Sequence, residues 1–296
     1  MDSFDATLIP ENQIAAVCAF ISKNNAEHIK PIMVQKTLQD NVFALLKRVE
    51  PDCVVLYYPN DDTHNNGFHV EYPVGHVIYI NTKQHYEKQI FTAAHELGHM
   101  WGLDKWMRET VKDYPNDPCW DERVISRFAA ELLMPNKEFT RSANELILDA
   151  RNNGSAQVSL SAMIFVVTTL MNEFFTPFKS VVRRLFELGF ITESAGRTLW
   201  GENENLPWEQ IVAYSMRIAE EHDYAKLYKI SEKKWIDGVD ELFRKAKTLQ
   251  ALPEKWLECF NERFGGNLDK QDMGLTDALL DISNKEGEID AANSVY

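Results

Sequence analysis

The stretch His95-Glu96-Leu97-Gly98-His99 constrains this chain more than any other. It reads H-E-x-x-H and lies inside a run with helical character. Side chains four residues apart lie on one face of an α-helix, so two imidazoles there can bind the same metal ion. Glu96 then lies beside that ion, where a carboxylate can take a proton from water. The motif therefore predicts a catalytic metal site with His95 and His99 as ligands and Glu96 as general base.

The neighbours of the motif favour a buried helix over the alternative, a surface helix with two solvated histidines. Phe91, Ala94 and Leu97 surround the histidines with apolar or small side chains. A glycine in a helix interior costs about 1 kcal/mol relative to alanine. Gly98 therefore predicts a close packing contact at this point of the helix.

Composition limits the classes of protein to which this chain can belong. Its 296 residues can form one large domain or two smaller ones, and 45% hydrophobic residues suffice for a core. The net charge of −14 argues against broad nonspecific binding to nucleic acid, which requires a basic surface. No apolar run approaches the roughly 18 residues of a transmembrane helix. The acidic start Met1-Asp2-Ser3-Phe4-Asp5 is unlike a secretory signal, so we expect a cytoplasmic protein.

Three short β-rich runs precede the motif helix, at residues 53–58, 68–72 and 76–81. Turn residues such as Pro59 and Pro73 end the first two runs. We expect a small antiparallel or mixed sheet that leans on the motif helix. An edge strand of this sheet could pair with the extended backbone of a peptide.

Helical periodicity accounts for most of the remaining chain. Helices are predicted across residues 11–50, where Pro31 could open the second one, at 120–134, throughout 141–200 and from 205 onward. A polar loop is expected between the motif helix and residue 120. The two helices within 170–189 resemble a helix-turn-helix, but few basic residues accompany them, and a structural hairpin is the preferred interpretation.

These elements divide the chain into three predicted regions. Residues 1–140 form the metallopeptidase domain, and residues 141–200 form a helical, helix-turn-helix-like region. Residues 201–296 form a helical C-terminal region that ends in a mobile acidic tail after Gly265-Gly266.

A catalytic zinc ion needs three protein ligands and one open position, so the motif leaves one ligand to be found. The helix predicted at 120–134 and the residues after it offer Asp121, Glu122, Glu131 and Glu138. Glu131 lies about 13.5 Å beyond Glu122 along the axis, at about 1.5 Å per residue. Therefore at most one end of this helix can reach the metal, and the residues alone leave the choice open.

Three stretches around the motif form one recognisable pattern. They are Val77-Ile78-Tyr79-Ile80-Asn81, the run Q-I-F-T-A-A-H-E-L-G-H from Gln89 to His99, and Glu122 followed by Phe128-Ala129-Ala130-Glu131-Leu132-Leu133-Met134-Pro135. This pattern resembles the ImmA/IrrE family of metallopeptidases, in which a strand precedes an F-T-x-A-H-E-L-G-H helix and a later E-x-x-A-N-x-F-A-A-x-L-L-M-P helix. The likeness covers residues 50–140 and extends to 181–191. The chain departs from the pattern at Ile125 and Ser126, where the family usually has Ala and Asn or Asp.

The resemblance implies that Glu122, which opens the second motif, is the third metal ligand, with Asp121 as the alternative. It implies Zn²⁺ as the cofactor, although a site of two histidines and one carboxylate also accepts Mn²⁺ or Fe²⁺. It also implies an α+β fold. In this fold a small three-stranded sheet packs on a zincin-like H-E-x-x-H helical core, and an all-helical C-terminal region follows.

Members of the family cleave helix-turn-helix repressors in stress, phage and mobile-element responses, and some form toxin–antitoxin pairs. The expected function is therefore zinc-dependent hydrolysis of a peptide bond in an Xre-type repressor or antitoxin. Candidate donors to the oxyanion are His69, His76, Tyr79 and Tyr114. The alternative is a zinc-binding protein of a toxin–antitoxin pair that acts by binding its partner. Direct DNA binding through residues 170–189 is a third hypothesis, which the acidic balance disfavours.

Overall fold

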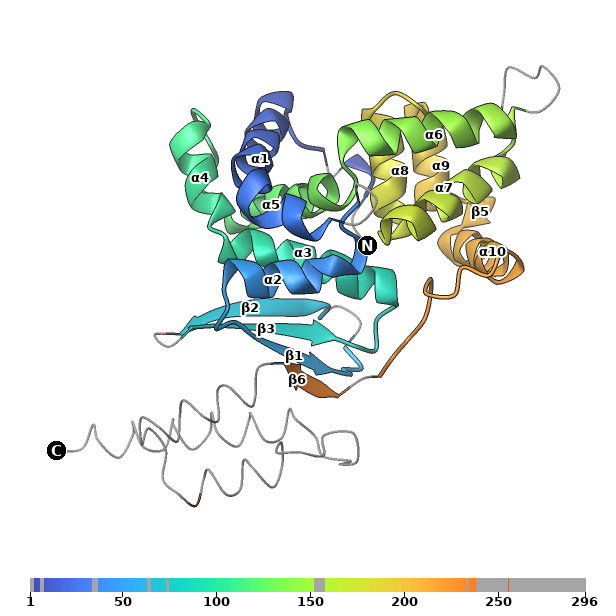
Figure 1. Cartoon of the computed structure of the whole chain (residues 1–296). Coiled ribbons are helices and arrows are strands. Elements are labelled where there is room, and N and C mark those ends of the chain that lie inside the picture. The colour runs from blue at the N-terminus through green and yellow to red at the C-terminus, as the bar shows by residue number, and fades with distance from the viewer. Residues whose placement is uncertain are drawn as a thin grey trace.

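The computed structural model describes residues 3–5, 8–33, 37–62, 65–72, 75–151, 158–232, 234–237 and 255 of the chain (Figure 1). Its helices are α1 (Glu11–Asn24), α2 (Val42–Val49), α3 (Tyr86–Met100), α4 (Leu103–Thr110), α5 (Pro118–Leu133), α6 (Asn136–Ala150), α7 (Leu160–Phe174), α8 (Phe178–Glu187), α9 (Glu193–Trp200) and α10 (Trp208–Glu221). Its strands are β1 (Val54–Tyr58), β2 (Gly67–Tyr72), β3 (Gly75–Asn81), β4 (Glu202–Asn203), β5 (Leu206–Pro207) and β6 (Trp235–Asp237). The described part is therefore α+β and mostly helical, which confirms the predicted class.

A mixed sheet with the strand order β2-β3-β1-β6 forms one layer of the molecule. β3 pairs antiparallel with β2 and parallel with β1, and β1 pairs antiparallel with β6. Pairing places Phe68, Tyr79, Leu56 and Ile236 in one row across the sheet. Helices α2 and α3 lie over one face of the sheet (Figure 1). In this strand order β2 lies at the edge of the sheet, and it also contacts α3.

Two predictions about the fold were wrong. The sheet has more than the three predicted strands, and the C-terminal region is not all-helical. The three predicted strands exist as β1, β2 and β3, but β6 adds a fourth strand at the edge of β1. β6 has three residues, which is too few for a period-two alternation to be visible in the sequence. The two-residue strands β4 and β5 likewise form a small hairpin inside the region predicted to be helical.

Two local predictions in the N-terminal half were also wrong. Helix α4 occupies the segment predicted as a polar loop. Its buried residues Leu103 and Met107 lie one turn apart, and two positions are too few to reveal a helical period. Pro31 does not open the second helix, because it lies in a separate 3₁₀ turn, Lys30–Ile32, and α2 begins at Val42.

One cluster of buried apolar side chains runs through the described residues from Phe4 to Leu227. It includes α7 and α8, which are bent by 106° relative to each other, and six of the ten residues of α8 are buried. Among the described residues no single helix is long and apolar enough to cross a membrane, and that bent pair meets the length and composition test only as a pair. The division into three regions stays a prediction, and the acidic tail lies outside the described residues.

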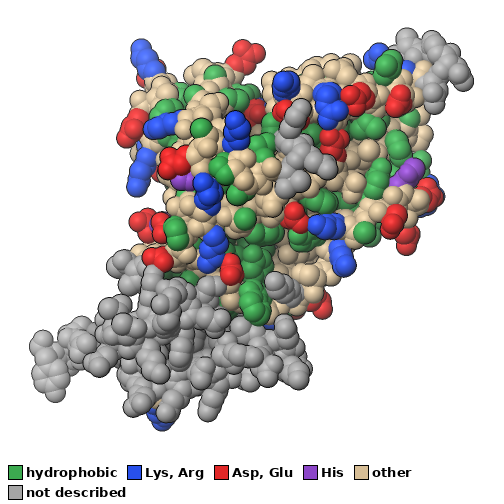
Figure 2. All heavy atoms as spheres, viewed as in Figure 1, with side chains coloured by type: hydrophobic (Ala, Val, Ile, Leu, Met, Phe, Trp, Pro, Cys, Tyr) green, Lys and Arg blue, Asp and Glu red, His purple; other side chains and the backbone are tan. Residues whose placement is uncertain are grey.

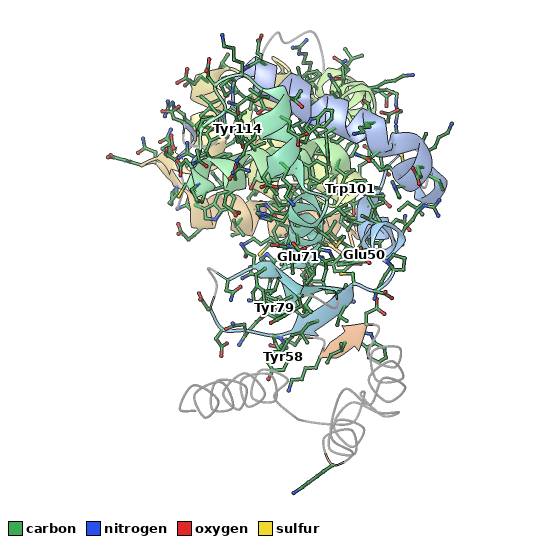
Figure 3. All side chains as sticks on the ribbon, turned by 90° about the vertical axis from the view of Figure 1, so that its left-hand side faces the viewer. Glu50, Tyr58, Glu71, Tyr79, Trp101 and Tyr114 are labelled. Atoms are coloured by element: carbon green, nitrogen blue, oxygen red, sulfur yellow. The ribbon has the colours of Figure 1, made fainter. Side chains whose placement is uncertain are left out.

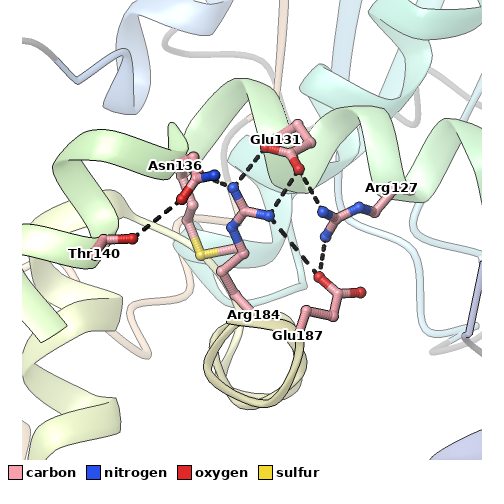
Figure 4. Close-up of polar contacts among 7 residues, drawn as sticks. Arg127, Glu131, Asn136, Thr140, Arg184 and Glu187 are labelled. Carbon is pink, nitrogen blue, oxygen red and sulfur yellow. Dashed lines mark hydrogen bonds and ion pairs between the residues drawn. The ribbon is translucent and has the colours of Figure 1, made fainter. Parts of the chain in front are cut away.

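A buried network of four charged side chains joins α5 to α8 (Figure 4). The two terminal nitrogens of the Arg184 guanidinium group donate to the Glu131 carboxylate, Nη1 to Oε1 at 2.7 Å and Nη2 to Oε2 at 2.6 Å. Arg127 pairs with Glu131 and also with Glu187. The side chain of Arg184 is 2% exposed and that of Glu131 is 6% exposed, so solvent cannot substitute for a missing partner.

We predict that Glu131→Ala strongly destabilises the chain. Removing this carboxylate leaves two buried guanidinium groups short of a partner, which costs roughly 3–5 kcal/mol. Equilibrium unfolding in urea, followed by circular dichroism, measures the change. The matched control is Glu145→Ala on α6, whose exposed pair with Arg141 contributes at most about 1 kcal/mol. Equal effects of the two substitutions would show that the network does not hold α5 against α8.

Candidate metal centre

Helix α3 carries the two histidines and the glutamate of the H-E-x-x-H motif. His95 and His99 lie one turn apart with ring centroids separated by 5.1 Å, and both face the same cavity. Glu96 lines that cavity too, although the residue is only 5% exposed. The motif therefore lies on a buried helix, as its apolar neighbours predicted, and not on a solvated one.

Helix α5 brings Glu122 to the two histidines. Its Oε2 lies 2.9 Å from Nε2 of His95, and its Oε1 lies 3.3 Å from Nε2 of His99. The start of α5 is fixed by Pro118 in its first turn and by the side chain of Asp117, which accepts a hydrogen bond from the backbone N–H of Cys119. Glu122 therefore faces both imidazoles across the interface of α3 and α5.

The donor set of this cluster fits a divalent metal ion. One ligand atom from each of His95, His99 and Glu122 lies within 4.8 Å of the others. Four tetrahedral ligands at about 2.1 Å from Zn²⁺ are about 3.4 Å from each other. The separations of 2.9 and 3.3 Å between the carboxylate and the two ring nitrogens approach that value. A small outward movement of these side chains would therefore accommodate the ion.

The other carboxylates considered as third ligands are engaged elsewhere or lie outside this cluster. Asp121 pairs with Arg108 and accepts a hydrogen bond of 2.9 Å from the hydroxyl of Tyr114. Glu131 belongs to the buried ion network. Glu138 lies in the first turn of α6. Of the described residues only His95, His99 and Glu122 form a cluster suited to a metal ion.

Ser126 is a site residue whose role the sequence analysis did not identify. Its Oγ lies 3.2 Å from Nδ1 of His95, one helical turn after Glu122 on α5. In a metal-loaded site, a hydrogen bond from the N–H at Nδ1 to this hydroxyl would leave the lone pair of Nε2 for the ion. The sequence marked this position only as a departure from the family pattern. The structure shows that Ser126 contacts the imidazole ring of His95.

Gly98 permits the close approach of α3 and α5, as its place in the motif predicted. A Cβ at this position would lie 2.9 Å from Cγ2 of Ile125 and 3.0 Å from Cδ1 of Phe128. Cγ2 branches from the Cβ of Ile125, and because isoleucine has one strongly preferred χ1 rotamer in a helix, this methyl group cannot easily rotate away. The contact therefore fixes the spacing that puts Glu122 opposite the two histidines.

The two carboxylates of the site have opposite electrostatic environments. Hydrogen bonds from His95 and His99 hold the pKa of Glu122 well below its usual range, although partial burial opposes them. Burial raises the pKa of Glu96, and the two imidazoles only partly oppose this effect. Glu122 is thus an anion suited to ligation, whereas Glu96 has the raised proton affinity that a general base requires.

The cavity in front of the motif has a volume of about 440 Å³ and reaches the edge strand β2. Phe91, Thr92 and Ser126 line its helical side, and Asn66, Gly67, Phe68 and His69 line its strand side. β2 is an outer strand of the described sheet, so one of its edges has no partner strand there. An extended peptide paired with that edge would therefore run beside the cavity that contains the metal cluster.

Of the four candidate oxyanion donors, the structure brings His69 into this cavity. Its Nε2 lies 2.8 Å from Nδ1 of His76, and burial together with that neighbour lowers the pKa of His69 to about 4. Tyr79 instead donates to the backbone carbonyl of Tyr58 at 3.1 Å within the sheet, and Tyr114 lies among the helices beside Asp121 (Figure 3). His69 is therefore a neutral imidazole held at the site by His76.

Comparison with known proteins identifies one family. Residues 49–186 match the model of the family Peptidase_M78, described as IrrE N-terminal-like domain. Among solved structures, a Mycobacterium tuberculosis transcriptional regulator is similar, with 16% sequence identity and a TM-score of 0.38. That match covers 62% of this chain and 49% of the regulator, which is about half of the regulator's length. No curated protein matches the sequence.

We predict that Gly98→Ala destabilises the chain in a way that Ile125→Ala relieves. The added methyl overpacks the α3–α5 interface at a cost of about 1–3 kcal/mol, against a gain in helix propensity of about 1 kcal/mol. Without Cγ2 of Ile125 only the propensity gain and the contact with Phe128 remain. Urea unfolding of the four proteins of this double-mutant cycle measures the coupling. Additive effects would mean that the two residues do not set the helix spacing.

Proposed function

We propose that this chain, whose residues 49–186 form an IrrE N-terminal-like domain of the Peptidase_M78 family, is a zinc-dependent endopeptidase. The observation that carries the proposal is the convergence of two imidazole nitrogens and a carboxylate beside a buried glutamate, in a cavity bordered by an edge strand. The family match supports a metallopeptidase in general. The metal, the substrate and the roles of individual residues are our proposals.

His95, His99 and Glu122 would hold the ion. Zn²⁺ in such a site lowers the pKa of a bound water toward 7 and polarises the scissile carbonyl. Ser126 would orient His95, because its Oγ can accept a hydrogen bond from the N–H at Nδ1. These roles follow from the directions of the ring nitrogens, because both Nε2 atoms point toward Glu122.

Glu96 takes the proton from the attacking water and then delivers it to the leaving amine. Burial raises its pKa, and so increases the affinity of this carboxylate for the proton that it takes up. His69, held by His76 and neutral because its pKa is about 4, is the side chain of β2 placed to donate a hydrogen bond to the carbonyl oxygen as charge develops there. The outer edge of β2, which pairs with no other strand of the described residues, would bind the peptide backbone in extended form.

For the substrate, we propose a helix-turn-helix transcriptional repressor of the Xre type, cleaved to switch on a stress, phage or mobile-element response. The support for this step is the resemblance to the ImmA/IrrE family. The alternative is a zinc-binding partner of a toxin–antitoxin pair that acts without proteolysis. The buried Glu96 favours catalysis, because binding a metal does not require that carboxylate.

The metal site predicts a specific thermal stabilisation by Zn²⁺. At a free Zn²⁺ concentration 100 times the dissociation constant, the metal-free chain gains about 2.7 kcal/mol of stability. Glu122→Ala removes most of this gain, whereas Asp121→Asn, the neighbouring carboxylate, retains it. The gain also fades below about pH 6, because protons then compete for the imidazoles. Differential scanning fluorimetry measures the shifts, and an unchanged response in Glu122→Ala would exclude this residue as a ligand.

The catalytic role of Glu96 predicts loss of turnover without loss of metal. Co-expression with a candidate Xre-type repressor, followed by intact mass measurement of that repressor, compares wild type with Glu96→Gln. Wild type should produce fragments and Glu96→Gln should not, and His69→Ala should produce them more slowly than wild type while binding Zn²⁺ normally. Cleavage by Glu96→Gln at the wild-type rate would reject the base assignment. An intact repressor that co-purifies with both forms would favour the binding-protein alternative.

A further inference from the structure

Strand β2 carries two exposed aromatic side chains. Phe68 is 45% exposed and Tyr72 is 53% exposed, whereas every other Phe, Tyr or Trp side chain of the described residues is buried or half-buried. A single exposed apolar side chain is ordinary in a folded protein. Here two uncovered rings lie on one strand of six residues, and Phe68 also lines the metal cavity. The two rings are therefore candidates for contact with a molecule that reaches the metal centre.

Both rings lie on the face of the sheet that points away from the helices. Side chains along a strand alternate between its two faces, so Phe68 and Tyr72, four residues apart, share one face. The ring of Phe68 lies 5.1 Å, between centroids, from the ring of Tyr79, its partner across the β2–β3 pair. Ile78 and Ile80, on either side of Tyr79, belong to the apolar cluster that the helices share, and they point the other way.

The opposite face of β2 points toward α3. A Cβ at Gly67 would meet Cγ2 of Thr92 on that helix, and His69 lines the metal cavity. Figure 3 shows Glu71, the next residue of this face, on the side of the sheet that carries the helices. β2 therefore presents the metal cavity on one face and the two exposed rings on the other.

A peptide paired with the outer edge of β2 would alternate between the faces in the same way as the strand itself. Half of its side chains would point toward the cavity, and the other half would lie beside Phe68, Val70 and Tyr72 on the opposite face. From Phe68 to Tyr72 the strand extends about 13 Å, at about 3.3 Å per residue. Three alternate side chains of the peptide would span this distance.

The face of β2 that carries the rings is uncharged. It consists of Phe68, Val70 and Tyr72, whereas Glu71, the acidic residue of this strand, lies on the other face. Acidic and basic side chains are interspersed on the face of the molecule shown in Figure 2, without a broad field of one sign. Aromatic and β-branched side chains stabilise neighbouring strands when they lie opposite an aromatic ring. The chemistry of this face therefore suits apolar side chains of a peptide.

We propose that the outer face of β2 selects substrates with aromatic or β-branched side chains at alternate positions of the segment that pairs with this strand. The inference rests on the proposed peptidase function, since the metal centre fixes which peptide bond is cut. One such side chain packs beside Phe68, next to the cavity, and another packs beside Tyr72, four residues along. Phe68 and Tyr72 are thus specificity-determining residues, and the substrate is an extended peptide with an apolar residue at every second position.

Two sets of hexapeptide hydroxamates test this inference without requiring turnover, because the hydroxamate group anchors each probe to zinc. One set carries this group at the N-terminal end and the other at the C-terminal end, since the metal can lie at either end of the paired segment. Each set has three members, with serine throughout, tyrosine at the odd positions, or tyrosine at the even positions. Titration calorimetry on the zinc-loaded full chain measures the dissociation constants. In one set we expect one alternation to bind at least about fivefold more tightly than both the other alternation and the serine probe.

Three variants and one control assign this preference to the rings. Phe68→Thr and Tyr72→Thr remove a ring but keep a residue suited to a strand. Each should reduce the preference at least about twofold, and the double variant should abolish it. Leu148→Thr on α6, where the side chain is 71% exposed and lies outside the metal cavity, should leave the preference unchanged. Thermal stabilisation of each variant by Zn²⁺ shows that its fold and metal centre are intact.

The outcomes separate this inference from the proposed function. Equal binding of all probes within each set, or equal gains from both alternations, would overturn the inference while the metal centre stands. A preference that survives in the double variant would also overturn it, because the rings would not be its source. If Zn²⁺ stabilises the chain but no probe binds, β2 does not pair with a peptide beside the metal, and the inference is overturned although the metal centre stands. If Zn²⁺ does not stabilise the chain, the metal centre fails and the inference fails with it.

Discussion

The contact between α3 and α5 at Gly98 is the constraint on which the rest of this structure depends. One helix carries two histidines and the other carries the carboxylate that faces them, so the distance between the helices decides whether three donors converge. With hydrogen in place of a methyl at Gly98, Ile125 and Phe128 approach the backbone of α3 closely. This spacing leaves the Glu122 oxygens 2.9 and 3.3 Å from the two ring nitrogens. A larger residue at position 98 would push α3 and α5 apart. The donor groups would then be separated, although none of the three donor side chains would have changed.

Helix α5 is fixed from its other side as well, by the ion network with α8. Arg127 and Glu131 follow Glu122 by five and nine residues, so the same helix presents the carboxylate that faces the two histidines at one end and buried charges further along. The bidentate pair of Arg184 with Glu131 restricts rotation of α5 about its axis.

The sequence predicted what depends on local spacing and missed what depends on distant contacts. The H-E-x-x-H helix, the strands β1 to β3 and the helix of Glu122 all follow from periodicity or motif. The strand β6 was missed because three residues carry no period, and its pairing with β1 joins segments far apart in the chain. Ser126 was seen as a departure from a pattern, but its contact with His95 depends on how α3 and α5 pack.

The environments of the two glutamates explain how one site can use the same functional group for two tasks. Glu122 receives hydrogen bonds from both imidazoles, which stabilise its anion and suit it to a cation. Glu96 lies on the helix itself, 5% exposed, where burial favours its protonated form. In the proposed enzyme the carboxylate with the lower pKa would serve as ligand, and the one with the higher pKa would exchange protons. The order His-Glu on α3 and the distance to α5 set these two environments, because neither glutamate can occupy the other's environment without a change of helix packing.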